Sequence, residues 1–147
     1  MNARQDEVQL QVVGVFEQRL DLRDQDQRLP LLVLKDPSER ELRLPIGSCE
    51  GLAIHIAIQQ RMVPRPLTHD LAIRLLERLS ADIDRVVIDD LSDHDFHATI
   101  HLHTTQGDLT LDARPGDAVA LALRAEVPIC ATEGVLSRAA HTDGDTP

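Results

Sequence analysis

Asp112-Ala-Arg-Pro-Gly-Asp-Ala-Val-Ala-Leu-Ala-Leu-Arg124 is the stretch that says most about how this chain folds, and Arg65-Pro-Leu-Thr-His-Asp-Leu71 follows the same design. In both stretches Arg-Pro stands before an acidic residue and a run of apolar residues. Proline is favoured in the first turn of a helix, where its missing N–H would have no partner. Pro115 therefore predicts a helix through the end of the first stretch, and Thr68 predicts, as an N-cap, a helix over residues 68–79.

The segment 68–79 has the periodicity of a surface helix. Its apolar side chains recur on one face, and its charged side chains lie away from that face. The apolar residues are Leu71, Leu75, Leu76 and Leu79, and the charged ones are Arg74, Glu77 and Arg78. Residues 52–58, in contrast, fit a buried helix or a strand equally well, because so short an apolar run has no distinguishing period.

Alternating apolar residues predict strands in the first third of the chain. Residues 8–16 alternate and then change phase around Gly14, which predicts a strand with a bulge. The polar segment 17–28 is expected to be a loop. Residues 31–34 and 42–46 flank a short stretch with turn chemistry and predict a β-hairpin.

The second half of the chain mixes strands and helices. Residues 84–90 predict a buried strand, and residues 96–102 predict a half-buried strand in which polar and apolar residues alternate. Residues 109–111 form a second hairpin with that strand, and residues 127–130 predict a short strand before a last short helix. The predicted fold class is therefore α+β, with a mixed, mostly antiparallel sheet whose hairpins pack against three to four helices in a single domain.

The composition is that of one globular domain. The chain has 147 residues, 42% of them hydrophobic, and at this length a domain buries about two-thirds of its unfolded surface. The domain is expected to span residues 8–138, between a flexible N-terminus (1–7) and a flexible tail (139–147). Cys49 and Cys130 show no metal-site spacing and are expected to be free thiols.

The sequence also predicts the cellular location of the protein. No apolar run approaches the roughly 18 residues that cross a bilayer. The first residues lack the apolar core of a signal peptide. We therefore expect a cytoplasmic protein without a membrane partner.

The net charge argues against a nucleic-acid partner. The formal charge is −10, and Phe16 and Phe96 are the only aromatic residues. Nucleic-acid binding usually needs a basic face and aromatic side chains on which bases stack. Arg61, Arg65 and Arg114 nevertheless remain candidates for a local basic patch, because part of the acidic excess lies in the predicted ends and loops.

With Ile46-Gly-Ser-Cys-Glu50 upstream, the two Arg-Pro stretches resemble, in order and spacing, the motifs of the bifunctional nuclease domain family, over residues 8–138. The resemblance implies a bacterial member with a single α/β domain and cleavage of RNA and DNA, and it favours a helix for residues 52–58. Two positions depart from the family pattern. Gly116 stands where members usually carry Ser, so a hydroxyl role there is lost, and Gly51 stands where they often carry Ala.

The Arg65–Leu71 stretch places a guanidinium, an imidazole and a carboxylate at a predicted helix N-terminus. Such an end has unpaired amides and a partial positive charge, which suit anion binding. His69 and Asp70 are candidate catalytic residues, since an imidazole exchanges protons near neutral pH. Arg65 and Thr68 are candidates for binding substrate. The structural alternative is that Thr68 caps the helix, Asp70 offsets its dipole and His69 lies on the surface.

Asp112 and Asp117 bracket the second Arg-Pro turn and are candidate catalytic residues and ligands of Mg²⁺ or Mn²⁺. Paired carboxylates hold such ions, which activate water for phosphodiester cleavage. Arg114 would offset charge on the phosphate, and Glu50, at a strand-to-helix junction, is the third acidic candidate. The structural alternative pairs Asp112 with Arg65 or Arg114 and locks the two loops together.

Four of the seven histidines lie within ten residues: His94, His97, His101 and His103. On a strand, His101 and His103 point the same way, roughly 7 Å apart. Two such imidazoles can chelate Zn²⁺ or a similar ion. A polar stripe that faces solvent is the alternative.

Two classes of function remain open. The first is a nuclease that hydrolyses phosphodiester bonds in RNA and/or DNA with a divalent metal ion. The second is a non-catalytic module for oligomeric interaction, with a homodimer favoured, or for binding a small anion. Asp70, Asp112 and Asp117 discriminate between them: a shared cleft favours the enzyme, and neutralisation of Arg65 and Arg114 favours the module.

Overall fold

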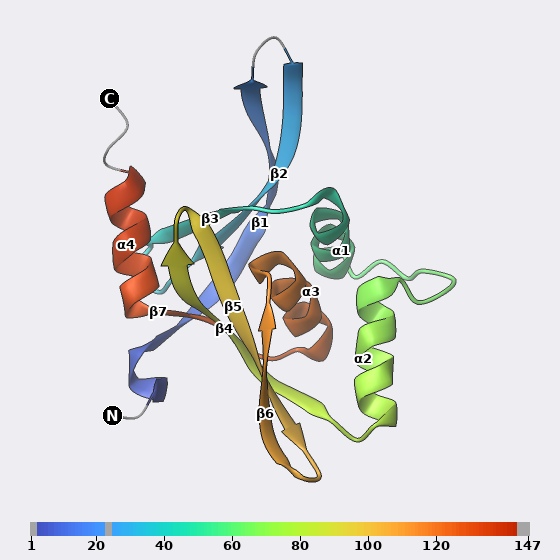
Figure 1. The fold of residues 1–147 in the computed structure, drawn as a ribbon. Coiled ribbons are helices and arrows are strands. Elements are labelled where there is room, and N and C mark those ends of the chain that lie inside the picture. The colour runs from blue at the N-terminus through green and yellow to red at the C-terminus, as the bar shows by residue number, and fades with distance from the viewer. Residues whose placement is uncertain (1–2, 23–24, 144–147) are drawn as a thin grey trace.

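The structure is a computed structural model that describes residues 3–22 and 25–143, within which it shows seven strands, four α-helices and one short 3-10 helix (Figure 1). The strands are β1 (Glu7–Leu22), β2 (Gln25–Lys35), β3 (Glu41–Pro45), β4 (Asp82–Ser92), β5 (Asp95–Thr104), β6 (Gly107–Ala113) and β7 (Ile129–Thr132). The α-helices are α1 (Ser48–Ile58), α2 (Thr68–Arg78), α3 (Pro115–Ala125) and α4 (Glu133–Asp143), and the 3-10 helix is Ala3–Asp6.

The strands form one sheet in the order β3-β2-β1-β7-β4-β5-β6. Neighbouring strands are antiparallel except β4 and β7, which are parallel. Parallel strands cannot be joined by a tight hairpin, and the chain returns to β7 through α3. This mixed, mostly antiparallel sheet with four helices confirms the α+β class predicted from the sequence.

The helices cover the sheet from two sides. Figure 1 shows α4 on one side of the strands and α1, α2 and α3 on the other. α3 packs against β4 and β5 and is flanked by α1 and α2, whereas α4 packs against β4 and β7. The buried residues of α3 include Ala118, Val119, Ala120 and Ala122. Because these side chains are small, α3 can approach the sheet closely and fill the centre of the domain.

The core is aliphatic, as the scarcity of aromatic residues requires. Its largest fully buried side chains include Leu32, Leu34, Leu42, Leu44 and Ile54. Phe96 is only partly buried against this core, and Phe16 is 51% exposed. Both cysteines are free, as expected; Cys49 is exposed and Cys130 is buried in β7.

The predicted bulge in β1 is confirmed, but the predicted loop over residues 17–28 is wrong. The pairing of β1 with β2 shifts by one residue between Val12 and Gly14. The outer part of the two strands, residues 17–22 and 25–29, continues as a ribbon that extends away from the helices (Figure 1). A ribbon with no core beneath it needs no apolar alternation. Its strands are therefore polar, and exposed Arg28 and Glu17 form an ion pair across it at 3.3 Å.

The α2 helix corrects a second prediction, because Thr68 does not cap it. Thr68 is the first helical residue, and Leu67 occupies the cap position without a side-chain cap. Instead, Asp70 reaches back, and its Oδ2 accepts a hydrogen bond of 2.9 Å from the N–H of Leu67. The expected helix over 68–79 is otherwise present, although none of its residues is fully buried.

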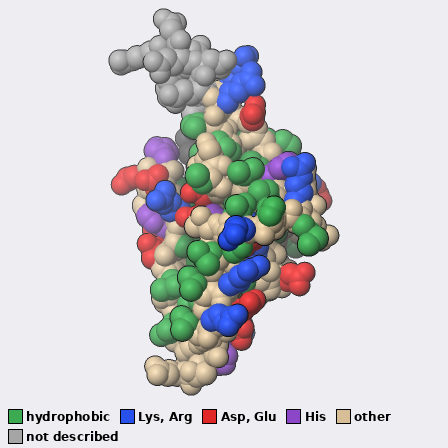
Figure 2. Space-filling view, turned by 90° about the vertical axis from the view of Figure 1, so that its right-hand side faces the viewer, with side chains coloured by type: hydrophobic (Ala, Val, Ile, Leu, Met, Phe, Trp, Pro, Cys, Tyr) green, Lys and Arg blue, Asp and Glu red, His purple; other side chains and the backbone are tan. Residues whose placement is uncertain are grey.

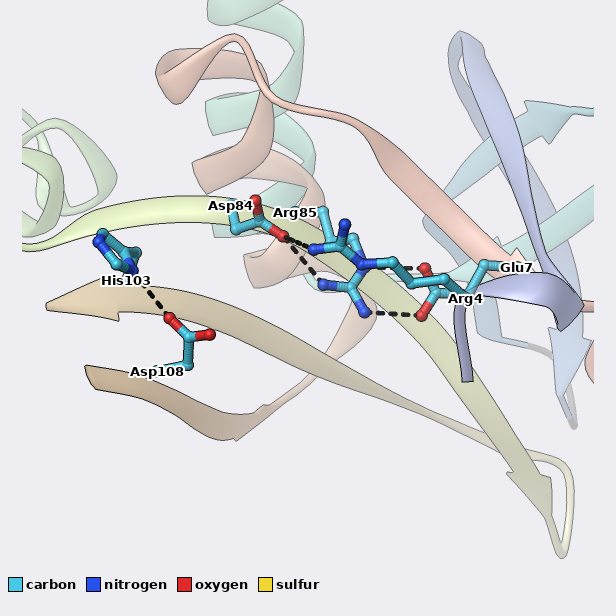
Figure 3. Close-up of polar contacts among 6 residues, drawn as sticks. All are labelled: Arg4, Glu7, Asp84, Arg85, His103 and Asp108. Carbon is cyan, nitrogen blue, oxygen red and sulfur yellow. Dashed lines mark hydrogen bonds and ion pairs between the residues drawn. The ribbon is translucent and has the colours of Figure 1, made fainter. Parts of the chain in front are cut away.

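Both expected flexible ends contain secondary structure within the described residues. Ala3–Asp6 is a 3-10 helix, and Glu7 starts β1. The Arg85 guanidinium binds the Glu7 carboxylate through two hydrogen bonds, of 2.8 and 2.9 Å, which fasten the start of β1 to β4 (Figure 3). At the other end, α4 continues to Asp143, and residues 144–147 lie outside the described residues.

Candidate active site

A cleft of about 570 Å³ opens where three segments of the chain meet, residues 44–50, 94–97 and 112–116. They are the end of β3 with the N-terminus of α1, the β4–β5 turn with the start of β5, and the end of β6 with the N-terminus of α3. The polar residues that line it are Glu50, His94, Asp95, His97, Asp112 and Arg114. Three of the predicted site residues, Glu50, Asp112 and Arg114, are therefore gathered in one place although up to 64 positions separate them in sequence.

Glu50 is the most unusual residue of the cleft. Its Oε2 atom is buried and has no hydrogen-bond partner among the described residues. A buried carboxylate oxygen without a partner is costly, since the carboxylate loses its water and gains nothing in return. Such an atom is therefore a candidate ligand for a cation.

Two glycines make room for the Glu50 side chain. A Cβ at Gly47 would come within 2.1 Å of Glu50 Oε2, and a Cβ at Gly116 would come within 3.1 Å of Glu50 Cβ and of Ile46. Gly47 has an ordinary φ of −74°, so space rather than backbone conformation explains the glycine there. Gly116, where family members usually carry Ser, therefore lacks a hydroxyl and lets the start of α3 lie against Glu50.

Asp112 and Arg114 stand at the end of β6 and at the start of α3. Both are exposed, and in the described part of the chain neither forms a hydrogen bond or an ion pair through its side chain. The Asp112–Arg65 or Asp112–Arg114 pairing that the structural alternative required is thus absent there. Asp112 and Arg114 remain available to a ligand in the cleft.

The sequence analysis did not assign His94 and His97 to this cleft. The hairpin register provides the signal that would have found His97. Thr104 pairs with Gly107, and the same register pairs Thr99 with Asp112, so its continuation brings His97 next to Arg114. His94 lies in the β4–β5 turn with a φ of 67°, a left-handed conformation that is uncommon without glycine.

His69 and Asp117, both predicted to be catalytic, bind each other instead of lining the cleft. His69 Nε2 lies 2.8 Å from Asp117 Oδ1, and the His69 side chain is only 11% exposed. The contact joins the first turn of α2 to the first turn of α3. This pair therefore positions the two helices.

Asp70 has a similar role on the same two helices. Arg124 Nε donates a hydrogen bond of 2.6 Å to Asp70 Oδ1, and its other nitrogens donate to the carbonyl oxygens of Ala120 and Ala53. Burial works to raise the pKa of Asp70, but the hydrogen bonds from Arg124 and from the Leu67 N–H outweigh it and hold this pKa below its usual value. Asp70 thus neutralises an arginine, as the structural alternative expected, but the partner is Arg124.

The remaining predicted residues are on the surface outside the cleft. Arg65 and Thr68 are exposed in and after the loop that precedes α2. Arg65 is one of five arginines whose side chains form no hydrogen bond or ion pair with any described residue. The group is Arg61, Arg65, Arg74, Arg78 and Arg114. Figure 2 shows a column of Lys and Arg side chains among hydrophobic ones on the face at the right of Figure 1.

The histidines of β5 do not gather into a metal site in the described structure. His103 Nδ1 lies 2.8 Å from Asp108 Oδ1 (Figure 3), and this hydrogen bond raises the pKa of His103. Burial, and then the charge of Arg85, lower the pKa of His101. The two imidazoles therefore have different environments, one tied to a carboxylate and one next to a cation.

The cleft suits an ion that prefers oxygen ligands, such as Mg²⁺ or Mn²⁺, better than one that prefers nitrogen and sulfur ligands, such as Zn²⁺. No group of three or more His, Cys, Asp or Glu side chains that could hold a metal occurs among the described residues. Mg²⁺ is usually held by one or two carboxylates, with water and substrate phosphate filling its other positions. Glu50, with its unpaired Oε2, and Asp112 fit that mode of binding.

The fold and the site define a small α+β protein with an acidic cleft between two helix N-termini. The model of the bifunctional nuclease domain family matches residues 32–143, and the chain belongs to this family. Two relatives from Mycobacterium tuberculosis are each 38% identical over 117 residues, which cover 79% of this chain and 70% of theirs. They are the uncharacterized protein MT1877 of strain CDC 1551 / Oshkosh and the uncharacterized protein Rv1829 of strain H37Rv.

No helix in the described residues has the length and apolar character to span a membrane.

Proposed function

We propose that this protein is a nuclease that hydrolyses phosphodiester bonds in RNA and/or DNA within the cleft between α1 and α3. Membership of the bifunctional nuclease domain family supports this class of reaction. The observation that carries the assignment to the cleft is the buried Glu50 Oε2, which has no partner among the described residues. We also propose a cytoplasmic location, on the sequence arguments given above.

Glu50 and Asp112 are the residues that would hold Mg²⁺ or Mn²⁺. The ion would polarise the phosphate and lower the pKa of a bound water. Gly47 and Gly116 leave the space that the Glu50 side chain occupies, since a Cβ at either position would crowd it. Asp112 stands at the end of the edge strand β6, where a long substrate can reach it.

Arg114 is the residue that would bind the phosphate. A guanidinium donates paired hydrogen bonds to phosphate oxygens. Arg114 is also the N-cap of α3, and the first amides of a helix carry a partial positive charge. His97 and His94 line the same cleft and are the candidate groups for proton transfer.

The test is an assay with labelled single-stranded RNA and DNA, in Mg²⁺, Mn²⁺ or EDTA, on the wild type and on Glu50→Gln and Asp112→Asn. We expect cleavage that requires a divalent ion and falls at least about 100-fold in either variant, since each removes a candidate ligand. Asp108→Asn is the matched control, because Asp108 is on the same strand and outside the cleft. Equal cleavage by the wild type and the cleft variants would assign the activity to a contaminant or to another site.

The alternative is a non-catalytic module for oligomeric interaction or for binding a small anion. The His69–Asp117 and Asp70–Arg124 contacts favour this alternative for the Arg65–Leu71 stretch, because there they join helices. Absence of cleavage, together with binding of pyrophosphate that Arg114→Met abolishes, would support the anion-binding function.

A further inference from the structure

We propose that the outer face of α2 is a self-association surface, on which α2 of a second copy of this chain packs antiparallel to form a two-fold symmetric dimer. The proposal does not depend on the nuclease function. It rests on the side chains that α2 exposes.

Those side chains form an apolar ridge. Leu71, Leu75 and Leu79 are 49%, 56% and 75% exposed. They recur every four residues, and rows of this spacing are the ridges that fit into the grooves of a neighbouring helix. A surface helix of a monomer normally turns such a stripe toward the core. Here the stripe is exposed along the full length of the helix.

The opposite face of α2 fixes the helix in this orientation. His69 binds Asp117, Asp70 binds Arg124, and Ile73 and Leu76 pack against the core. Turning the leucines inward would break both polar contacts. The exposed ridge is therefore a stable feature of the single chain.

The size of the apolar surface is that of an interaction site. Leu67, which directly precedes α2 and is 39% exposed, extends the ridge at its N-terminal end. These four leucines expose on the order of 400 Å² of mostly apolar surface, within the range of patches that mark such sites. A standard interface buries about 800 Å² per partner, and the charged residues around the ridge supply the rest.

Charge favours an antiparallel second copy as the occupant. Arg61 and Arg65 precede α2, whereas exposed Glu77, Asp82 and Glu126 surround its C-terminal end and outnumber the Arg78 of its last turn. A two-fold axis across the middle of α2 places the basic end of one copy opposite the acidic end of the other. It also makes the two helix dipoles antiparallel, which is favourable. This pairing offsets the repulsion that a chain of net charge −10 would otherwise feel.

A second copy explains more of this surface than a nucleic acid does. A nucleic acid would contact Arg74 and Arg78 but would leave the leucines in water. In a helix pair, the leucines are buried, and the long stems of these arginines cover the edges of the ridge while their charged ends stay in water.

The test measures mass in solution by light scattering and sedimentation velocity over a range of concentrations. We expect the wild type to be a dimer at tens of micromolar. Leu75→Glu buries two unpaired charges at the axis and should weaken the dimer by about 100-fold or more. Phe16→Glu is the matched control, because Phe16 is equally exposed, on β1 away from α2, and this variant should remain a dimer.

A cross-linking experiment keeps the proposal testable if Leu75→Glu fails to fold. In a Cys49→Ser background, which removes the exposed native thiol, Leu75→Cys should form a disulfide-linked dimer on mild oxidation, and Phe16→Cys should not. A wild type that is monomeric at every concentration would overturn the proposal, and so would a Leu75→Glu variant that folds and still dimerises. Binding of a labelled oligonucleotide by a monomer, lost in Arg74→Glu, would make the face a nucleic-acid surface and would also overturn it.

Discussion

The Arg124 side chain forms hydrogen bonds to residues of three helices, α1, α2 and α3. Replacing it tests how much the Asp70–Arg124 pair stabilises the fold. The Arg124 side chain is 9% exposed and that of Asp70 is 27% exposed. In Arg124→Met three hydrogen bonds disappear, one to Asp70 and two to the backbone carbonyls of Ala120 and Ala53. The Met side chain keeps most of the apolar stem, so the packing changes little.

The expected loss of stability depends on the Asp70 carboxylate, which keeps its charge when Arg124 is removed. Breaking a fully buried ion pair costs about 3–5 kcal/mol, because it leaves an uncompensated charge. Asp70 keeps the hydrogen bond from the Leu67 N–H and is partly in contact with water, so we expect a loss of about 2–3 kcal/mol in the free energy of unfolding. Urea unfolding at one fixed protein concentration measures it, with Arg78→Met as the control, since Arg78 is exposed and unpaired on α2. The control should change stability by no more than about 0.5 kcal/mol.

The pH dependence gives this prediction a second readout. The pKa of folded Asp70 is held below its usual value, so its contribution to stability is present above pH ~4 and is lost as the pH falls through the folded pKa. The difference between the wild type and Arg124→Met should therefore shrink in acid. A loss below about 1 kcal/mol at neutral pH, or a difference that is the same in acid, would refute the view that this pair joins the helices.

Three further predictions follow from single contacts. Gly47→Ala should force the Glu50 carboxylate to turn, because the new Cβ would lie 2.1 Å from Glu50 Oε2; we expect cleavage to fall by about 100-fold while urea unfolding changes little. Asp108→Asn should lower the pKa of His103 toward its usual value in an NMR titration, since the Asp108 hydrogen bond raises it; the small stabilisation from that pair is present below pH ~6.5 and fades as the pH rises through the folded pKa. Arg85→Met should release the start of β1 from β4, so that the amides of residues 7–10 exchange hydrogen faster while those of β5 do not; equal protection would mean that backbone pairing with β7 is sufficient.

Local signals in the sequence predicted most of the fold because they depend on near neighbours. Pro115 starts α3, and the phase change near Gly14 marks the bulge in β1. The failure over residues 17–28 has a physical cause: hydrophobic alternation reports burial, and a ribbon outside the core buries little. Thr68 was predicted to be a cap from its residue type alone, but Asp70 forms the hydrogen bond at that end of α2.

The candidate site was harder to predict because its polar contacts connect distant residues. Asp70 and Arg124 are 54 positions apart, and His69 and Asp117 are 48 apart. Sequence spacing identifies which residues are able to pair, but the packing of α2 on α3 decides which of them do. Of the acidic residues proposed to act together, Asp70 and Asp117 hold the helices in place, and Glu50 and Asp112 face the cleft.

Because Glu50 and Asp112 face the cleft, the charge of the cleft decides whether a phosphodiester can bind there. Glu50 and Asp112 together outweigh the single positive charge of Arg114, and the chain as a whole carries −10. A phosphodiester that entered such a cleft unaided would meet net repulsion, which is strong where Glu50 is shielded from water. A divalent cation at the two carboxylates reverses the sign of that interaction. Cleavage that persists undiminished in EDTA would therefore contradict the proposed site, even if the protein proves to be a nuclease.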